Sequence, residues 1–205
     1  MGNGIAHVSA LSGLNVVLTD INAESLQKGL ATISKNMDRQ VQKEKISATD
    51  KDLAMGNIIT STDMNALKDC DIVVEAATEN PNIKASIFKA LDDICKLDCI
   101  LATNTSSISI TEIASNTNRP EKVIGMHFMN PVPVMKLVEV IRGHLTSNDT
   151  VSTVQNLSTT MNKIAVECND YPGFVANRIL MPMINEAIFC LMEGVADAQA
   201  IDDIM

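Results

Sequence analysis

The sequence predicts an α/β fold in which short strands and helices alternate around a parallel sheet. Apolar runs rich in Val and Ile recur along the chain, and Asp, Asn, Gly or Pro bounds each of them. The runs are continuously apolar, which is typical of parallel strands that helices cover on both faces. The expected strands are residues 15–19, 71–75, 99–103, 122–126 and 136–141.

Segments with helical spacing separate these strands. The N-terminal residues begin inside a helix, and Gly13 ends it. Residues 23–45 are amphipathic and charged, and residues 82–96 repeat apolar side chains at helical spacing. Helices are also expected at 109–116 and 149–162. Strand and helix therefore alternate through most of the chain.

The pattern changes near Cys168. No strand candidate follows it, residues 170–173 have turn chemistry, and the remaining residues have helical patterns. We therefore predict a sheet domain over residues 1–168 and an all-helical domain over residues 169–205. The last predicted helix has no C-terminal stop signal, so we expect this second domain to be incomplete.

Composition excludes some functions. The chain has 205 residues, of which 46% are hydrophobic, a formal net charge of -9 and a pI of about 4.7. This acidic balance argues against nucleic acid and against an anionic membrane surface as partners. No apolar run approaches the roughly 20 residues that span a bilayer. We expect a soluble, cytoplasmic protein.

The cysteines agree with a cytoplasmic protein. The chain has 5 cysteines, an odd number, and none forms a C-x-x-C pair. Cys95 and Cys99 could form half of a metal site on a helix, but no His or second cysteine pair lies at ligand spacing. We therefore expect buried thiols and no metal.

An acidic residue ends the first expected strand. Asp20 follows Gly2 at about the 20-residue spacing between a dinucleotide-binding glycine turn and its ribose-binding acid. Gly2 would be the last glycine of that fingerprint, with the first strand and two glycines absent. A helix start and a turn aspartate explain the same residues equally well. As a cofactor contact, Asp20 favours NAD, because a carboxylate repels the 2′-phosphate of NADP.

Polar residues follow the strand at 99–103 directly, in the run T-N-T-S-S-I-S. Open parallel sheets bind ligands outside the carboxyl ends of their strands. Ser106 or Ser107 is therefore placed to bind a substrate. Helix capping is the alternative, since Ser109 and Glu112 have capping-box spacing.

His127 ends the next strand, and Glu139 interrupts the apolar strand after it. A carboxylate on a buried face is costly unless it is paired or hydrogen-bonded. An imidazole is a suitable partner, because the carboxylate fixes its tautomer and leaves the other ring nitrogen to exchange a proton. Alternatives for Glu139 are an exposed edge position or a salt bridge with Lys136 or Arg142.

The run E-N-P-N-I-K follows another strand end. Its Glu79 and Lys84 could contact the ribose and the nicotinamide side of a cofactor. Both are equally ordinary as capping residues near Pro81, and the residues alone favour capping.

Six stretches of the sequence form a pattern together: MGNGIAH, VVLTDIN, DIVVEAATEN, ATNTSSISI, GMHFMNPVPVMKLVEVI and PGFVANRIL. They resemble the L-3-hydroxyacyl-CoA dehydrogenase family, most closely its short members that act on 3-hydroxybutyryl-CoA. The resemblance covers almost the whole chain in order, and its most specific part is the run from His127 to Ile141.

The resemblance assigns roles to individual residues. It implies a catalytic His127–Glu139 pair, a substrate-contacting Ser106 and an active-site Asn177. The implied NAD contacts are Asp20, Glu79, Lys84, Ser106 and Asn130, beside Gly2 of the glycine turn. A lysine in the long helix that follows the strand at 15–19, the family's second strand, would contact coenzyme A, and Lys43 is our choice.

The family likeness further implies a Rossmann-type NAD-binding domain and reversible hydride transfer at C3 of a 3-hydroxyacyl-CoA, in fatty-acid oxidation or butyrate-type fermentation. It implies a homodimer through the helical domain. Against the family pattern the chain lacks the first strand and two glycines, so we expect these 205 residues alone to bind NAD poorly. The alternatives are a dehydrogenase of a free hydroxy acid, or a module of a multifunctional fatty-acid oxidation protein.

Overall fold

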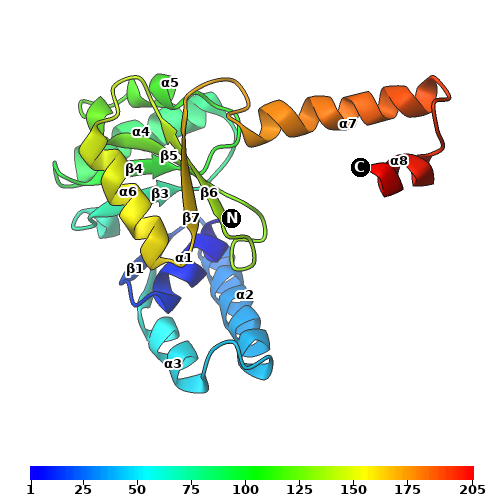
Figure 1. Ribbon diagram of the computed structural model, residues 1–205. Helices are drawn as coiled ribbons and strands as arrows, with labels where there is room; N and C mark the ends of the chain where they lie inside the picture. Colours follow the sequence, from blue (N-terminus) through cyan, green and yellow to red (C-terminus); the bar gives the residue numbers. More distant parts are fainter.

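Figure 1 shows the structure, a computed structural model that describes all residues from 1 to 205. Its strands form two sheets. In the smaller sheet, Val16–Thr19 (β1) and Ile58–Ser61 (β2) pair in parallel. The larger sheet has the order β3-β4-β5-β6-β7, with strands Ile72–Glu75, Ile100–Thr103, Val123–Phe128, Leu137–Arg142 and Ile164–Asn169. The predicted α/β class is confirmed.

The larger sheet is mostly parallel, as expected, but one strand pair departs from the expectation. β6 runs antiparallel to β5, whereas the other neighbours in this sheet are parallel. Only residues 129–136 join β5 to β6, and parallel neighbours need a crossover of a dozen or more residues. The short connection therefore dictates the antiparallel pair.

Most of the helices begin at side-chain caps that the sequence supplies. Asn22, Asn80 and Ser147 accept N–H hydrogen bonds at the first turns of three of the longer helices. The helices are Gly2–Leu11 (α1), Ala23–Gln42 (α2), Ala48–Gly56 (α3), Pro81–Ile94 (α4), Ile110–Ala114 (α5), Asn148–Thr160 (α6), Ala176–Met192 (α7) and Ala198–Ile204 (α8). Two 3₁₀ turns, Met64–Leu67 and Pro120–Lys122, complete the set.

Helices cover both faces of the larger sheet, as predicted (Figure 1). On one face, Val8 of α1 and Val154 of α6 pack against strand residues such as Ile124. On the other face, Phe88 of α4 and Ile110 of α5 form the core with the remaining strand residues. A smaller core joins α1, α2, α3 and β2. Burial of apolar surface in these layers is the main stabilising term of the domain.

Three elements were not expected from the sequence. They are α3, β2 and β7, and each is short or partly exposed. For α3 a signal exists, because Ser47 and Asp50 form a reciprocal capping box. β7 lies at the edge of the sheet, where mixed polar and apolar residues hide the strand pattern.

The C-terminal segment contains only helices, as expected. Figure 1 shows α7 extending away from the sheet domain, with α8 folding back at its far end. Neither helix has a buried residue, although α7 is rich in Ile, Leu, Met and Phe. The domain boundary at residues 168 and 169 stays a prediction.

The five cysteines are free, and Cys95 and Cys99 are buried as expected. No group of His, Cys, Asp and Glu side chains is arranged to hold a metal ion. No helix has both the length and the apolar character needed to cross a membrane.

Candidate active site

A histidine and a glutamate meet across the antiparallel pair β5–β6. His127 lies directly opposite Glu139 in the register, so both side chains project from the same face of the sheet. Nδ1 of His127 is 2.8 Å from Oε2 of Glu139. The two residues are only 7% and 4% exposed. The carboxylate therefore fixes the orientation of the imidazole and leaves Nε2 to face other groups.

The second oxygen of Glu139 binds the start of α7. Oε1 accepts hydrogen bonds from the N–H groups of Ala176 at 2.9 Å and Val175 at 3.2 Å. α7 has no side-chain cap of its own residues, and the positive end of a helix dipole favours a carboxylate. Arg142, an alternative partner predicted for Glu139, instead pairs with Glu167 at 2.6 Å. Glu139 thus links the sheet to the helical segment.

Ser106 and Asn177 complete a cluster around the imidazole. Oγ of Ser106 is 3.1 Å from Nε2 of His127. Nδ2 of Asn177 donates to the backbone oxygen of Ser106 at 3.2 Å. All four residues that the sequence nominated as catalytic therefore lie together. Ser107, the other candidate substrate-binding serine, is exposed.

The turn before α7 packs against the histidine. Phe174 is 3% exposed, and its ring centroid lies 6.0 Å from that of His127. Its backbone has a φ of 49°, and Gly173 before it has a φ of 78°. A side chain on Gly173 would also meet the backbone of Arg178, at 3.0 Å. Gly173 therefore permits the tight turn that places Phe174 and Asn177 beside the histidine.

Asp170 holds the same turn from the other side. Its Oδ2 accepts hydrogen bonds from the hydroxyl of Ser109 at 2.7 Å and from the N–H of Thr111 at 2.8 Å. Burial alone would raise the pKa of Asp170, but these hydrogen bonds outweigh burial and hold the pKa below its ordinary value. Ser109 also caps α5 through the N–H of Glu112, so the capping interpretation of Ser109 is confirmed.

Comparison with known proteins decides the family. The family model described as "3-hydroxyacyl-CoA dehydrogenase, NAD binding domain" matches residues 1–171, and the model of the C-terminal domain of the same family matches residues 173–205. The chain belongs to the 3-hydroxyacyl-CoA dehydrogenase family. It is accordingly an NAD-dependent oxidoreductase, as the sequence predicts.

Individual relatives agree with the family models. A probable 3-hydroxybutyryl-CoA dehydrogenase of Bacillus subtilis is 52% identical over the whole chain, which spans 71% of that protein. A 3-hydroxybutyryl-CoA dehydrogenase of Clostridioides difficile is 50% identical over the whole chain and 73% of its own length. The crystal structure of (S)-3-hydroxybutyryl-CoA dehydrogenase from Ralstonia eutropha matches with a TM-score of 0.95 at 50% identity, covering 98% of this chain and 71% of that one.

Most of the predicted cofactor contacts follow the carboxyl ends of strands, β1 in the smaller sheet and β3 and β5 in the larger one. Gly2 begins α1, which has no side-chain cap. A Cβ atom on Gly2 would lie 3.9 Å from Cβ of Ala76, just after β3. Asp20 follows β1, Glu79 follows β3 and Asn130 follows β5, and all three are exposed. Helix N–H groups suit phosphate and carboxylates suit ribose hydroxyls, so these residue types fit a dinucleotide. Their contacts with NAD stay predictions.

Lys84 lies in a different setting from the one expected. Its Nζ is 2.7 Å and 2.9 Å from the two carboxylate oxygens of Glu75, and both side chains are buried. Asn80 caps α4, so the capping alternative for Lys84 and Glu79 is wrong. The contact between Lys84 and NAD stays a prediction. Lys43, the predicted coenzyme A contact, is exposed at the end of α2 and also stays a prediction.

Sequence reasoning missed several residues of this region, namely Glu75, Thr103, Thr105, Asp170 and Phe174. For Glu75 a signal exists, because it is a carboxylate at the end of an apolar strand, the same feature that drew attention to Glu139. No comparable signal marks the others, because a threonine in a polar loop or a phenylalanine in a turn is ordinary.

Proposed function

We propose that this chain catalyses reversible hydride transfer between C3 of 3-hydroxybutyryl-CoA and NAD. The observation that carries the proposal is the buried His127–Glu139 pair, whose imidazole Nε2 faces the hydroxyl of Ser106. The names of the relatives at 50% and 52% identity support the four-carbon substrate. A free hydroxy acid is less well supported, because the expected mark of such an enzyme is a catalytic lysine in the helical region.

His127 would exchange the proton in this reaction. In the oxidation direction Nε2 takes the proton of the substrate 3-hydroxyl, and in reduction the same nitrogen returns it. Glu139 stabilises the imidazolium that forms, because it stays hydrogen-bonded to Nδ1. NAD, when bound, supplies the acceptor or donor of the hydride.

Ser106 and Asn177 would hold the oxygen at C3 of the substrate. Ser106 contacts Nε2 of His127, and Asn177 contacts the backbone of Ser106. The side chains of both residues carry groups that can donate a hydrogen bond to an oxygen. In the reduction direction such donors polarise the carbonyl. A substrate oxygen between Ser106 and His127 would replace their direct contact.

Binding of the remaining groups follows from the residues at the sheet edge. We assign Gly2, Asp20, Glu79, Lys84, Ser106 and Asn130 to NAD, and Lys43 to coenzyme A. Asp20 supports NAD over NADP, because its exposed carboxylate follows β1 and would repel a 2′-phosphate. A lower Michaelis constant for NADPH than for NADH would contradict this assignment.

The apolar surface of α7 supports a homodimer through the helical domain. Ile179, Ile184, Ile188 and Met192 are exposed at 64%, 44%, 52% and 73%. A helix with this composition normally buries its apolar residues, and a large exposed patch marks an interaction surface. A second copy offers the same apolar helix. Light scattering at micromolar concentration tests the proposal, which predicts twice the mass of 22.1 kDa.

The substrate is tested by NADH oxidation with acetoacetyl-CoA and, in parallel, with free acetoacetate. We expect activity with the CoA ester and none with the free acid. Equal activity with both would contradict a role for coenzyme A. Activity only with the free acid would favour the alternative dehydrogenase.

A further inference from the structure

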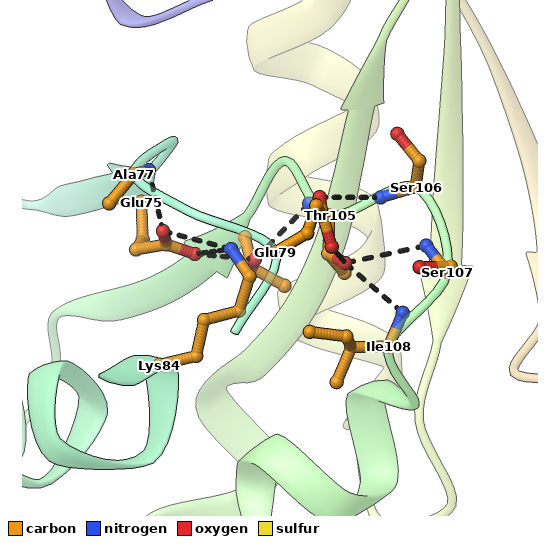
Figure 2. Close-up of polar contacts among 9 residues, drawn as sticks. Glu75, Ala77, Glu79, Lys84, Thr105, Ser106, Ser107 and Ile108 are labelled. Atoms are coloured by element: carbon orange, nitrogen blue, oxygen red, sulfur yellow. Dashed lines mark hydrogen bonds and ion pairs between the residues drawn. The ribbon is translucent and has the colours of Figure 1, made fainter. Parts of the chain in front are cut away.

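Figure 2 shows a polar network around Thr105 that includes neither His127 nor Glu139 and that contacts Ser106 through its backbone. Thr105 lies at its centre and is 0% exposed. Its hydroxyl donates to Oε2 of Glu79 at 2.6 Å and accepts from the N–H of Ile108 at 3.1 Å. A longer contact, at 3.4 Å, joins the same oxygen to the N–H of Ser107. The single donor and both acceptor positions of this hydroxyl are therefore in use.

The network holds the backbone of Ser106 on both sides. Oε1 of Glu79 accepts from the N–H of Ser106 at 3.2 Å, and Asn177 donates to its carbonyl oxygen at 3.2 Å. The carboxylate of Glu79 thus binds two consecutive residues: the side-chain hydroxyl of Thr105 and the backbone N–H of Ser106. With both peptide groups held, the backbone of Ser106 is fixed at a place from which Oγ reaches Nε2 of His127 at 3.1 Å.

The network is anchored in the core of the sheet domain. The N–H of Thr105 donates to the hydroxyl of Thr103 at 3.2 Å, and that hydroxyl donates to Glu75 at 2.8 Å. Glu75 is paired with Lys84, and Figure 2 shows this pair on the side of Thr105 away from Ser106. The positions of Thr103, Glu75 and Lys84 are all buried. Thr105 therefore connects a rigid buried ion pair to the loop that presents Ser106.

A capping role alone does not explain this arrangement. Ser109 caps α5, so the hydroxyl of Thr105 is not needed for that helix. Glu79 is exposed, and its carboxylate would be well solvated without the loop. Both of its oxygens are nevertheless bound to Thr105 and Ser106. The contacts restrain the loop at the point where it faces the histidine.

We propose that Thr105 is a positioning residue for the dehydrogenase reaction. Its hydroxyl holds Glu79 and the turn at residues 105–108, so that Oγ of Ser106 stays within hydrogen-bond distance of His127. Because Thr105 is 0% exposed, its hydroxyl would act through Ser106 and Glu79. This inference rests on the proposed function, because it requires Ser106 and His127 to act on the substrate.

The test is a double-mutant cycle between Thr105→Val and Ser106→Ala. Valine has nearly the shape of threonine but lacks the hydroxyl. We expect Thr105→Val to lower kcat for acetoacetyl-CoA about tenfold, since a small misplacement of a positioned group costs up to about a hundredfold. Thr105→Ser keeps the hydroxyl and should restore kcat to within about threefold of wild type, on the same scale.

The cycle separates positioning from general loss of structure. If Thr105 acts through Ser106, Thr105→Val has little further effect in the Ser106→Ala background. Additive losses, or wild-type kcat in Thr105→Val, would overturn the proposal. If Thr105→Val is unfolded by circular dichroism, Glu79→Gln weakens the same link from the exposed side. Its cycle with Ser106→Ala, measured as kcat at saturating NADH because Glu79 is also assigned to NAD, decides by the same criterion.

His127→Gln separates failure of this proposal from failure of the proposed function. Full turnover in His127→Gln would reject the assigned chemistry itself, whatever the cycle gives. Loss of turnover in His127→Gln together with an additive cycle would reject only the role of Thr105.

Discussion

The sheet domain and the helix α7 hold their parts of the site in opposite ways. In the sheet domain, His127 and Glu139 face each other in a fixed register and are almost fully buried. α7 supplies Asn177 but buries none of its own residues. Four contacts link it to the site: the N–H groups at its start that donate to Glu139, the hydrogen bond from Asn177 to Ser106, the Phe174 contact and the hydrogen bonds that Asp170 accepts. The His127–Glu139 pair is thus fixed by the sheet, whereas the position of Asn177 depends on a few contacts at a turn.

The largest effect is expected at the residue that serves both regions. Glu139→Gln keeps the shape of the side chain but removes the charge beside His127. We expect kcat to fall by about 10²- to 10⁴-fold, the range for general acid–base groups and their partners. Steady-state kinetics with acetoacetyl-CoA measure it. Glu167→Gln is the matched control, because Glu167 lies on the edge strand β7 and pairs with Arg142. A loss below tenfold in Glu139→Gln would contradict the assigned partnership.

The sheet domain is expected to lose stability when its buried ion pair is disrupted. Lys84→Met leaves the Glu75 carboxylate buried without its cation, which we expect to cost about 3–5 kcal/mol in the free energy of unfolding. Urea denaturation measures the loss. In the control, Lys28→Met removes an exposed pair with Glu24 and should change stability by less than about 1 kcal/mol. Equal losses of unfolding free energy in the two variants would show that the buried pair at Glu75 does not stabilise the domain more than an exposed pair does.

Substitutions on the exposed face of α7 are expected to change the oligomeric state and not the folding of the chain. Ile184→Ser combined with Ile188→Ser removes apolar surface from α7, and we expect the dimer to dissociate at micromolar concentration. Light scattering checks the mass. Glu186→Gln, on the same helix, should leave the mass unchanged. A dimer that survives the double substitution would place the interface elsewhere on the molecule.

The smallest effect concerns acid stability at the turn between the two regions. Hydrogen bonds keep the pKa of Asp170 below its ordinary value. Because the folded-state pKa is depressed, its contribution is fully present above the ordinary value of 3.8 and is lost as pH falls through the folded pKa. We expect Asp170→Asn to lower the free energy of unfolding by about 1–2 kcal/mol at neutral pH, the size typical of hydrogen bonds to a charged group. The loss should become progressively smaller in acid.

Urea denaturation over a pH series measures the Asp170 effect. Asp202→Asn on the exposed helix α8 is the control and should leave the pH dependence unchanged. A difference between Asp170→Asn and wild type that stays constant from neutral to acid pH would contradict the role assigned to the charge.

The sequence predicted most strands of the sheet domain, and it pointed to four residues that lie together in the structure: His127, Glu139, Ser106 and Asn177. Glu139 could be found because a carboxylate inside an apolar strand demands a partner, and His127 was available. The antiparallel register that joins them could not be found from strand composition, which indicated parallel strands throughout. It follows instead from the short connection at residues 129–136.

Other features lay outside what local patterns express. The edge strand β7 is mostly exposed and has a mixed pattern, so propensity does not reveal it. Thr105 and Lys84 acquire their roles from residues on other elements, which only the folded chain brings together. The sequence indicates which residues require partners, whereas the fold determines which partners they receive.

The turnover of His127→Gln with NADH and acetoacetyl-CoA tests the central claim most directly, with NADH affinity measured separately by fluorescence. We expect turnover to fall by at least about 10²-fold while NADH affinity stays within a few-fold of wild type. A variant that binds NADH normally and retains most of its turnover would contradict the assignment of His127 as the group that exchanges the substrate proton.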